Sequence, residues 1–148
     1  MLMPNAWVHW LQVGPEAVLL TGSLISIVDD DQAVRKSVRR LMQSLGFAAE
    51  TFRSAAAFLA SASLGETACL IADINMPEMT GVELYRCLID AGRAIPTILI
   101  TAYPDDTVRE RALHDGVVCY LPKPFDEADL LLCVREALER SGPHATDR

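Results

Sequence analysis

The sequence predicts an open, doubly wound α/β domain: a five-stranded parallel sheet in the order 2-1-3-4-5, covered by helices as a three-layer sandwich. Three observations support this fold. Short apolar runs alternate with segments of helical periodicity, five such strand–helix units follow one another, and 148 residues suffice for about one domain. A closed β/α barrel would need eight units and about 250 residues, so the open sheet is the better fit.

Each element follows from a local pattern. The strands are short apolar runs, as expected where a parallel sheet is buried on both faces. The helices carry apolar residues three and four apart, with Gly46 and Gly116 as stop signals and Ser54 and Asp126 as N-caps. In chain order, the expected elements are strand 24–28, helix 32–45, strand 47–52, helix 55–62, strand 69–72, a helix after Gly81, strand 96–100, helix 105–114, strand 117–121 and helix 127–140.

The composition excludes several classes of protein. With 51% hydrophobic and 22% charged residues, the chain is neither disordered nor fibrous. Thirteen basic residues against twenty acidic ones give a net charge of −7. Because contacts with phosphates need clustered Lys and Arg, this balance argues against direct DNA binding.

The cysteines and the apolar runs exclude further classes. The four cysteines, at 69, 87, 119 and 133, form no C-x-x-C pair, so we expect buried thiols rather than a zinc site or a disulfide framework. No apolar run reaches the roughly 18 residues of a membrane-spanning helix. The first 22 residues lack the basic start of a secretory signal. We therefore expect a cytoplasmic protein without a membrane partner.

Polar residues follow four of the five predicted strands. They are Asp29 with Asp30, Asp73, Thr101 and Lys123. In open α/β sheets, ligands bind outside the carboxyl ends of the strands, where the strand order reverses. In the order 2-1-3-4-5 the first and third strands are neighbours, so Asp30 and Asp73 are expected to face each other across that crevice.

These residue types suit phosphoryl transfer. Carboxylates placed together repel, so they need cations: Lys123 supplies one charge, and a divalent ion with oxygen ligands, best Mg²⁺, supplies two more. The metal and the ammonium group would neutralise phosphoryl oxygens, to which the Thr101 hydroxyl can donate a hydrogen bond. A central carboxylate can itself act as the nucleophile and form an aspartyl-phosphate.

Each of these residues alone has a simpler interpretation. An Asp at the end of a strand usually forms a turn or caps the next helix, as we expect of Asp31. Thr101 alone could cap a turn, and Lys123 alone could be a solvated charge. Four such residues at the strand ends of one sheet favour a shared site.

Five strings of residues, in the same order and spacing, resemble the receiver domain of two-component response regulators. The strings are Ser26-Ile-Val-Asp-Asp-Asp31, Asp73-Ile-Asn-Met-Pro77, Thr80-Gly81, Ile100-Thr-Ala102 and Leu121-Pro-Lys-Pro-Phe125. The resemblance covers about residues 23–141 and is greatest to the FixJ-like subfamily. It implies the flavodoxin-like receiver fold, with an N-terminal extension at 1–22 and a polar tail at 142–148.

The resemblance also implies a role for each acidic residue. Asp73 matches the aspartate that is phosphorylated in receivers. Asp29 and Asp30 match the pair that holds Mg²⁺ together with Asp73, and Asp30 is the better candidate for a direct ligand. Asn75 matches the position whose backbone carbonyl completes the metal shell.

The remaining matches concern the phosphoryl group and the switch. Thr101 and Lys123 match the hydroxyl and the lysine that contact the phosphoryl group, and Lys123–Pro124 matches a cis peptide bond. Tyr120 matches the aromatic switch residue. We expect Thr101 to move toward the phosphoryl group and Tyr120 to turn inward behind it; a half-buried tyrosine with one rotamer is the alternative.

Four basic residues of the first predicted helix lie opposite its apolar stripe: Arg35, Lys36, Arg39 and Arg40. A solvated helix face is the simple interpretation. A docking surface for the phosphodonor, a histidine kinase or phosphotransfer protein, is the functional one, since this helix borders the site in receivers.

The leading hypothesis is a stand-alone receiver, which is a phosphoacceptor rather than an enzyme. We expect it to signal to a downstream protein partner, or to form a homodimer, through the face made by the fourth predicted helix, the fifth strand and the fifth helix. One alternative is a receiver-fold interaction module that is never phosphorylated. Another is the receiver part of a FixJ-like transcription regulator that lacks its output domain. A flavodoxin-like cofactor binder is disfavoured because three aspartates follow the first strand, where a phosphate-binding loop would be needed.

Overall fold

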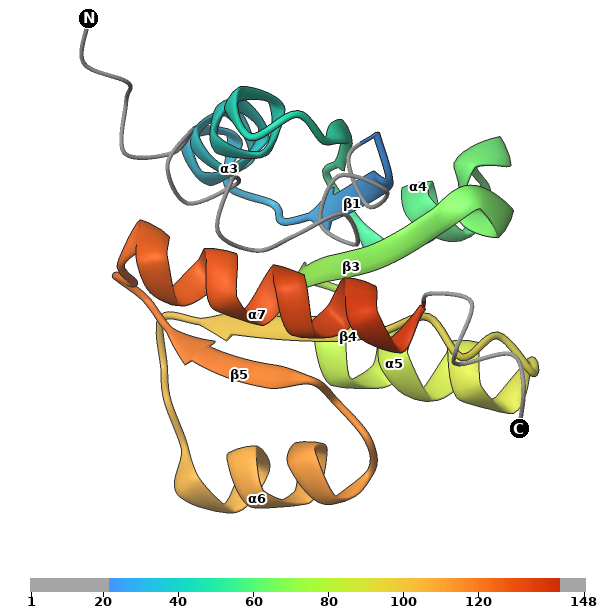
Figure 1. Cartoon of the computed structure of the whole chain (residues 1–148). Helices are drawn as coiled ribbons and strands as arrows, with labels where there is room; N and C mark the ends of the chain where they lie inside the picture. Colours follow the sequence, from blue (N-terminus) through green and yellow to red (C-terminus); the bar gives the residue numbers. More distant parts are fainter. Residues whose placement is uncertain (1–21, 142–148) are drawn as a thin grey trace, which may run out of the picture.

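The five strands lie in the order β2-β1-β3-β4-β5, all parallel, which confirms the predicted fold (Figure 1). The computed structural model describes residues 22–141. The strands are β1 (Leu24–Val28), β2 (Ala48–Phe52), β3 (Thr67–Asp73), β4 (Thr97–Thr101) and β5 (Cys119–Pro122). The helices are α3 (Gln32–Ser44), α4 (Ala55–Leu59), the 3₁₀ helix η1 (Ala62–Glu66), α5 (Gly81–Asp90), α6 (Asp106–His114) and α7 (Glu127–Arg140).

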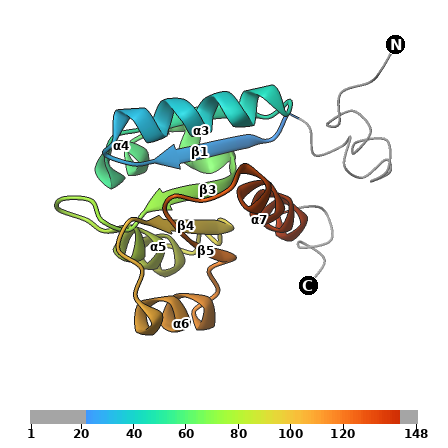
Figure 2. The same ribbon diagram turned by 90° about the vertical axis from the view of Figure 1, so that its left-hand side faces the viewer.

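The helices cover the two faces of the sheet unequally. Helices α3 and α7 pack on one face, and α4, α5 and α6 pack on the other (Figure 2). Because successive strand residues point to opposite faces, Ile25 and Ile27 of β1 join the core beneath α3 and α7, whereas Val28 joins the other core. Each face therefore has its own hydrophobic cluster.

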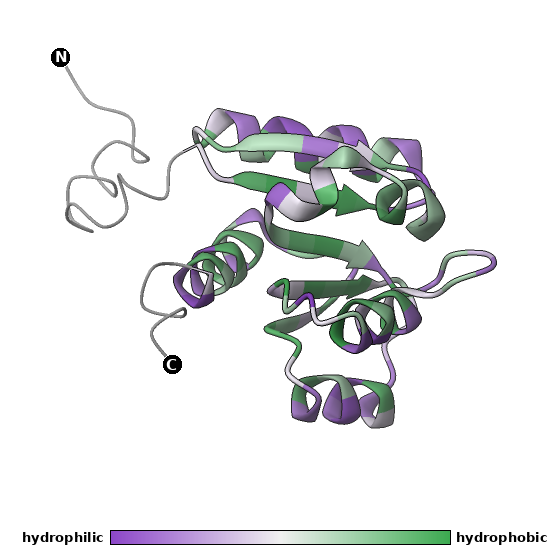
Figure 3. Ribbon diagram, turned by 90° about the vertical axis from the view of Figure 1, so that its right-hand side faces the viewer, coloured by the Kyte–Doolittle hydropathy of each residue, from purple (hydrophilic) through white to green (hydrophobic). Residues whose placement is uncertain are grey.

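The central strands explain the continuous apolar runs of the sequence. Every residue of β4 is buried, and so is every residue of β3 except Ala68. Figure 3 shows the hydrophobic residues gathered in these strands, while the outer helices are more hydrophilic. Helix α6 contributes one buried residue, Ala112, whereas α3, α5 and α7 each contribute at least two.

Side chains at the helix starts hold the loops that border the carboxyl edge. The predicted caps Asp31 and Ser54 are confirmed, since each accepts a hydrogen bond from a backbone N–H of its helix. Thr80 and Glu83 form a reciprocal capping box at the start of α5. Asp126 stands at the N-cap of α7 but makes no side-chain capping bond.

Several element boundaries differ from the predictions by one to three residues, and two of these differences have clear local reasons. The helix expected to extend through residue 62 ends at Leu59, because Ser61 accepts a hydrogen bond from the Ser63 N–H and starts the 3₁₀ turn instead. Strand β5 begins two residues later than expected, because the Val117 N–H still bonds to the Ala112 carbonyl of the preceding helix.

All four cysteines are free, but they differ in exposure. Cys69 and Cys133 are buried, and burial raises the pKa of both thiols. Cys119 is half-buried and Cys87 is exposed, so the prediction of buried thiols is confirmed only for Cys69 and Cys133. None of the helices within residues 22–141 has both the length and the apolar character needed to cross a bilayer. The predicted extension and tail lie outside the described residues, apart from Gly22.

Candidate functional site

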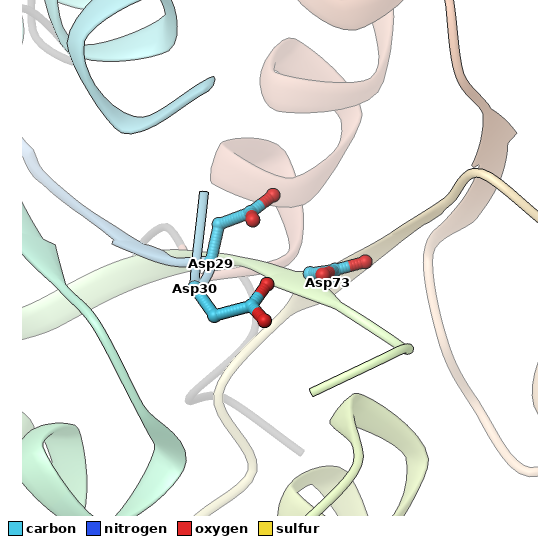
Figure 4. A group of neighbouring side chains, drawn as sticks. All are labelled: Asp29, Asp30 and Asp73. Atoms are coloured by element: carbon cyan, nitrogen blue, oxygen red, sulfur yellow. The ribbon is translucent and has the colours of Figure 1, made fainter. Parts of the chain in front are cut away.

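Three carboxylates meet where β1 and β3 end side by side. Asp29 and Asp30 follow β1 directly, and Asp73 is the last residue of β3. One carboxylate oxygen from each residue lies within 4.8 Å of the others, and Figure 4 shows the side chains gathered at this edge. Asp29 and Asp73 are buried, whereas Asp30 is exposed. The cluster therefore opens to solvent on the Asp30 side.

Lys123 approaches this cluster from the loop that follows β5. Its Nζ atom lies 2.9 Å from Asp29 Oδ2 and 3.5 Å from Asp73 Oδ1. Only 18% of the Lys123 side chain is exposed, so these ion pairs are largely shielded from solvent. The strand order, rather than sequence proximity, brings the lysine to the two aspartates.

The electrostatics of the cluster leave an excess of negative charge. Burial raises the pKa of Asp73, the Asp29 carboxylate raises it further, and Lys123 acts in the opposite direction. Burial lowers the pKa of Lys123, but its hydrogen bond and charge interactions with Asp29 and Asp73 outweigh this effect and raise it. Lys123 offsets one of the three carboxylate charges. A donor set made only of oxygen fits Mg²⁺ for the remainder.

Thr101 and Asn75 lie beside the carboxylates and bond to each other. Thr101, the last residue of β4, is fully buried, and its hydroxyl donates to Asn75 Oδ1 at 2.6 Å. The same hydroxyl accepts a hydrogen bond from the Tyr103 N–H at 3.0 Å. The backbone N–H of Asn75 donates to Asp73 Oδ1 at 3.3 Å. A hydroxyl, three carboxylates and an ammonium group thus converge at one edge of the sheet.

A family model of the response regulator receiver domain matches residues 25–135 of the chain. The chain belongs to this family. Receiver domains are the phosphoacceptor modules of two-component systems, and phosphorylation and Mg²⁺ binding at an acidic pocket are typical of them. The acidic cluster of this receiver lies at the carboxyl edge of the sheet, where the order of the strands reverses.

Similar proteins support a FixJ-like receiver. The response regulator protein TmoT of Ectopseudomonas mendocina is 38% identical over 128 residues, which cover 86% of this chain and 58% of TmoT. The transcriptional regulatory protein FixJ of Rhizobium meliloti is 38% identical over 125 residues, which cover 84% of this chain and 59% of FixJ. The solved structure of FixJ-N has a TM-score of 0.71 at 36% identity, covering 80% of this chain and 95% of that one. The chain thus spans a little over half the length of these curated relatives.

Tyr120 of the receiver is directed toward the start of α6. Its hydroxyl accepts a hydrogen bond from the Asp105 N–H at 2.9 Å, and 8% of the residue is exposed. The ring therefore already lies inside the fold, and its displacement on phosphorylation stays a prediction. The Lys123–Pro124 peptide bond, in the loop after the same strand, is cis.

The basic residues of α3 do not form one uniform surface. Arg35 donates a hydrogen bond to the backbone carbonyl of Asp29 at 2.7 Å, so it supports the end of β1 as well as facing outward. Arg40 is exposed and lies outside the hollow of about 200 Å³ beside this helix. The residues that line the hollow are Gln32, Arg35, Lys36, Arg39 and Thr51.

Sequence patterns do not predict the two contacts that hold the ends of β1 and β3. A Cβ atom at Gly81 would lie 2.5 Å from the Asp73 carbonyl oxygen, so the start of α5 fits against the end of β3 only with glycine there. A glycine as the first residue of a helix, where it is a poor helix former, is the one local signal of this close approach. The bond from Arg35 to Asp29 has no such signal, because it depends on how α3 packs on the sheet.

Proposed function

We propose that Asp73 accepts a phosphoryl group from the phosphohistidine of a histidine kinase or phosphotransfer protein. The observation that carries this proposal is the position of Asp73: a buried carboxylate in one cluster with Asp29 and Asp30 and in contact with Lys123. Each neighbour has a use in phosphoryl transfer, although Asp29 also accepts a hydrogen bond from the Asp31 N–H at 2.9 Å. The chain is then a phosphoacceptor in the cytoplasm that assists its own modification, rather than an enzyme acting on a separate substrate.

In the proposed reaction, a carboxylate oxygen of Asp73 attacks the phosphorus atom of the donor. An O–P bond forms as the P–N bond of the phosphohistidine breaks, and the released imidazole takes up a proton. Lys123 holds its ammonium group beside the acceptor carboxylate, where it can stabilise a phosphoryl oxygen. Mg²⁺ bound by Asp29, Asp30, Asp73 and the carbonyl of Asn75 would neutralise further phosphoryl charge.

The same site can change the surface through Thr101 and Tyr120. A phosphoryl group adds about two negative charges and new acceptor oxygens, to which Thr101 is expected to donate. Tyr120 connects the neighbouring strand to α6, so a shift of Thr101 alters the face formed by α6, β5 and α7. This face is the proposed contact for a downstream protein partner or for a second copy of the chain.

The basic residues of α3 are the proposed docking surface for the phosphodonor. Arg35, Lys36 and Arg39 line a hollow on the helix that follows Asp29 and Asp30. An acidic surface on the donor would complement them and bring its phosphohistidine to the neighbouring edge. Arg40 is expected to add to the attraction without lining the hollow.

The proposal that the domain acts alone has a defined alternative. The relatives TmoT and FixJ are longer than this chain, so a longer protein with a further segment would pass the signal on within one polypeptide. The mass of the native protein in a cell extract distinguishes the two: a band near 16.2 kDa supports the single domain, and a larger one contradicts it.

The proposed function is tested by measuring the mass of the intact protein by mass spectrometry after incubation with Mg²⁺ and acetyl phosphate. We expect a gain of one phosphoryl group that hydroxylamine removes, that EDTA prevents and that Asp73→Ala abolishes. No gain, with acetyl phosphate or with a cognate kinase, would favour the interaction module that is never phosphorylated.

A further inference from the structure

We propose that the side-chain amide of Asn75 is a latch that holds the Thr101 hydroxyl in the resting chain and opposes the switch. The inference rests on the proposed function, because it describes a bond that must break before Thr101 can donate to a phosphoryl group on Asp73. It assigns a positioning role to the Asn75 side chain, separate from the backbone carbonyl that the metal site would use.

The hydrogen bonds of Thr101 carry the inference. The residue is fully buried, its hydroxyl donates to Asn75 Oδ1 at 2.6 Å, and it accepts from the Tyr103 N–H at 3.0 Å. These two bonds fix the direction of the hydroxyl proton toward Asn75. The Asn75 N–H in turn bonds to Asp73 Oδ1, so one residue connects the acceptor carboxylate with the switch hydroxyl.

A hydroxyl group has a single proton, so the two destinations compete. Thr101 can donate to Asn75 or to a phosphoryl oxygen, but not fully to both. The bond to Asn75 joins two neutral groups, whereas a phosphoryl oxygen is charged and forms the stronger hydrogen bond. Phosphorylation therefore draws the hydroxyl away from Asn75. Because the bond to Asn75 must break, the equilibrium constant for this movement is lowered by about threefold to tenfold, the usual net effect of one neutral hydrogen bond.

The first test is a double-mutant cycle that measures the binding of beryllofluoride, a phosphoryl analogue, in the presence of Mg²⁺. Asn75→Leu keeps a similar side-chain volume and the backbone carbonyl but removes the acceptor. We expect it to tighten beryllofluoride binding by about threefold to tenfold. In the Thr101→Val background, where there is no hydroxyl to hold, the same substitution should change nothing.

Two results of this cycle would overturn the latch. The first is that Asn75→Leu leaves the affinity for beryllofluoride unchanged or weakens it. The second is that Asn75→Leu changes this affinity equally in both backgrounds, which would mean that its effect does not pass through Thr101. If the unsubstituted chain does not bind beryllofluoride at all, the proposed function fails, and the latch is then judged by a second measurement that needs neither metal nor analogue.

The second measurement follows the rotamer of Thr101 by NMR in the metal-free, unmodified protein. Three-bond couplings to the Thr101 methyl carbon should report one χ1 rotamer in the unsubstituted chain and averaging over several rotamers in Asn75→Leu. Glu78→Ala is the matched control, because Glu78 is exposed in the same loop, and it should leave the couplings unchanged. A single Thr101 rotamer in both the unsubstituted chain and Asn75→Leu would contradict the latch.

Discussion

The residues around Asp73 serve the proposed chemistry at a cost to the resting fold. Asp73 is 3% exposed and lies beside the buried Asp29, with Lys123 as the neighbouring cation. Burial and the Asp29 charge raise the pKa of Asp73, which means that folding disfavours its charged form. The three carboxylates thus carry an electrostatic cost, which a bound cation would reduce in the proposed function.

Replacing Asp73 by Asn should therefore stabilise the metal-free protein near neutral pH. Above the raised pKa the folded chain holds a carboxylate that repels Asp29, and the amide removes this repulsion, by about 1 kcal/mol for a close pair in a hydrated site. As the pH falls through the raised pKa, the folded chain takes up a proton at Asp73 and the advantage of Asn fades.

Urea unfolding in EDTA at neutral and at acidic pH measures this effect. Asp90→Asn, on the exposed end of α5, is the matched control and should change little at either pH. An Asp73→Asn variant that is less stable than the unsubstituted chain at neutral pH, or equally stabilised at both, would contradict the electrostatic account.

Gly81 provides a steric test at the same scale. A Cβ atom there would lie 2.5 Å from the Asp73 carbonyl oxygen, so Gly81→Ala must displace either α5 or the end of β3. We expect a loss of roughly 2 kcal/mol in the free energy of unfolding, typical of overpacking, together with slower phosphorylation. Gly65→Ala is the control, since its Cβ would meet only the tip of Arg93 at 3.7 Å. Equal stability of the two variants would show that the backbone at Asp73 adapts freely.

Among the elements, α6 is the one placed to move. Ala112 is its one buried residue and Val108 is partly buried, and its start is held by the Tyr120 hydroxyl through Asp105. An element with few buried apolar contacts and a polar attachment opens at low free energy. These properties suit the shift of α6 that the proposed switch requires.

Tyr120→Phe should loosen the start of α6 without unfolding the domain. The variant keeps the buried ring and loses both hydrogen bonds between the hydroxyl and the Asp105 backbone. The shorter of these, from the Asp105 N–H at 2.9 Å, contributes about 1 kcal/mol. Amide hydrogen exchange in the first turn of α6 should accelerate by about fivefold, while exchange in β3 and β4 stays slow.

Tyr103→Phe serves as the control for this experiment. Tyr103 is 74% exposed. Within the described residues, the tyrosine hydroxyl that bonds to the start of α6 is that of Tyr120, not that of Tyr103. If both variants, or neither, accelerate exchange in α6, the Tyr120 hydroxyl does not anchor this helix.

The elements that the sequence predicts well are those with a strong local signal. The runs at β1, β3 and β4 end in polar residues at the edge of the sheet, so both the strands and the carboxylate cluster follow from one pattern. The early end of α4 could not be predicted in the same way, because it depends on Ser61 bonding to Ser63 rather than to the helix. The Thr101–Asn75 bond joins residues 26 positions apart and appears only once β3 and β4 are paired.

For the whole molecule, the structure shows where part of the negative charge lies and which residues form the domain. Part of the −7 net charge is concentrated in the Asp29, Asp30 and Asp73 cluster, where Lys123 contacts two of the carboxylates and where we propose that Mg²⁺ binds. The described residues, 22–141, form one receiver domain with its site at one edge. Any response to phosphorylation must therefore leave this domain through its surface. On the face of α6, β5 and α7, which we propose as the output surface, Tyr120 connects β5 to the start of α6 by a hydrogen bond.

The central claim, that Asp73 is the phosphoacceptor, is tested most directly by chemical trapping. The protein is incubated with Mg²⁺ and acetyl phosphate and then treated with borohydride, which reduces an aspartyl-phosphate to homoserine. After proteolysis, peptide sequencing by mass spectrometry locates the homoserine. We predict homoserine at position 73 and intact aspartates at positions 29 and 30. Homoserine at 29 or 30, or at no position when Mg²⁺ and the donor are in excess, would contradict it.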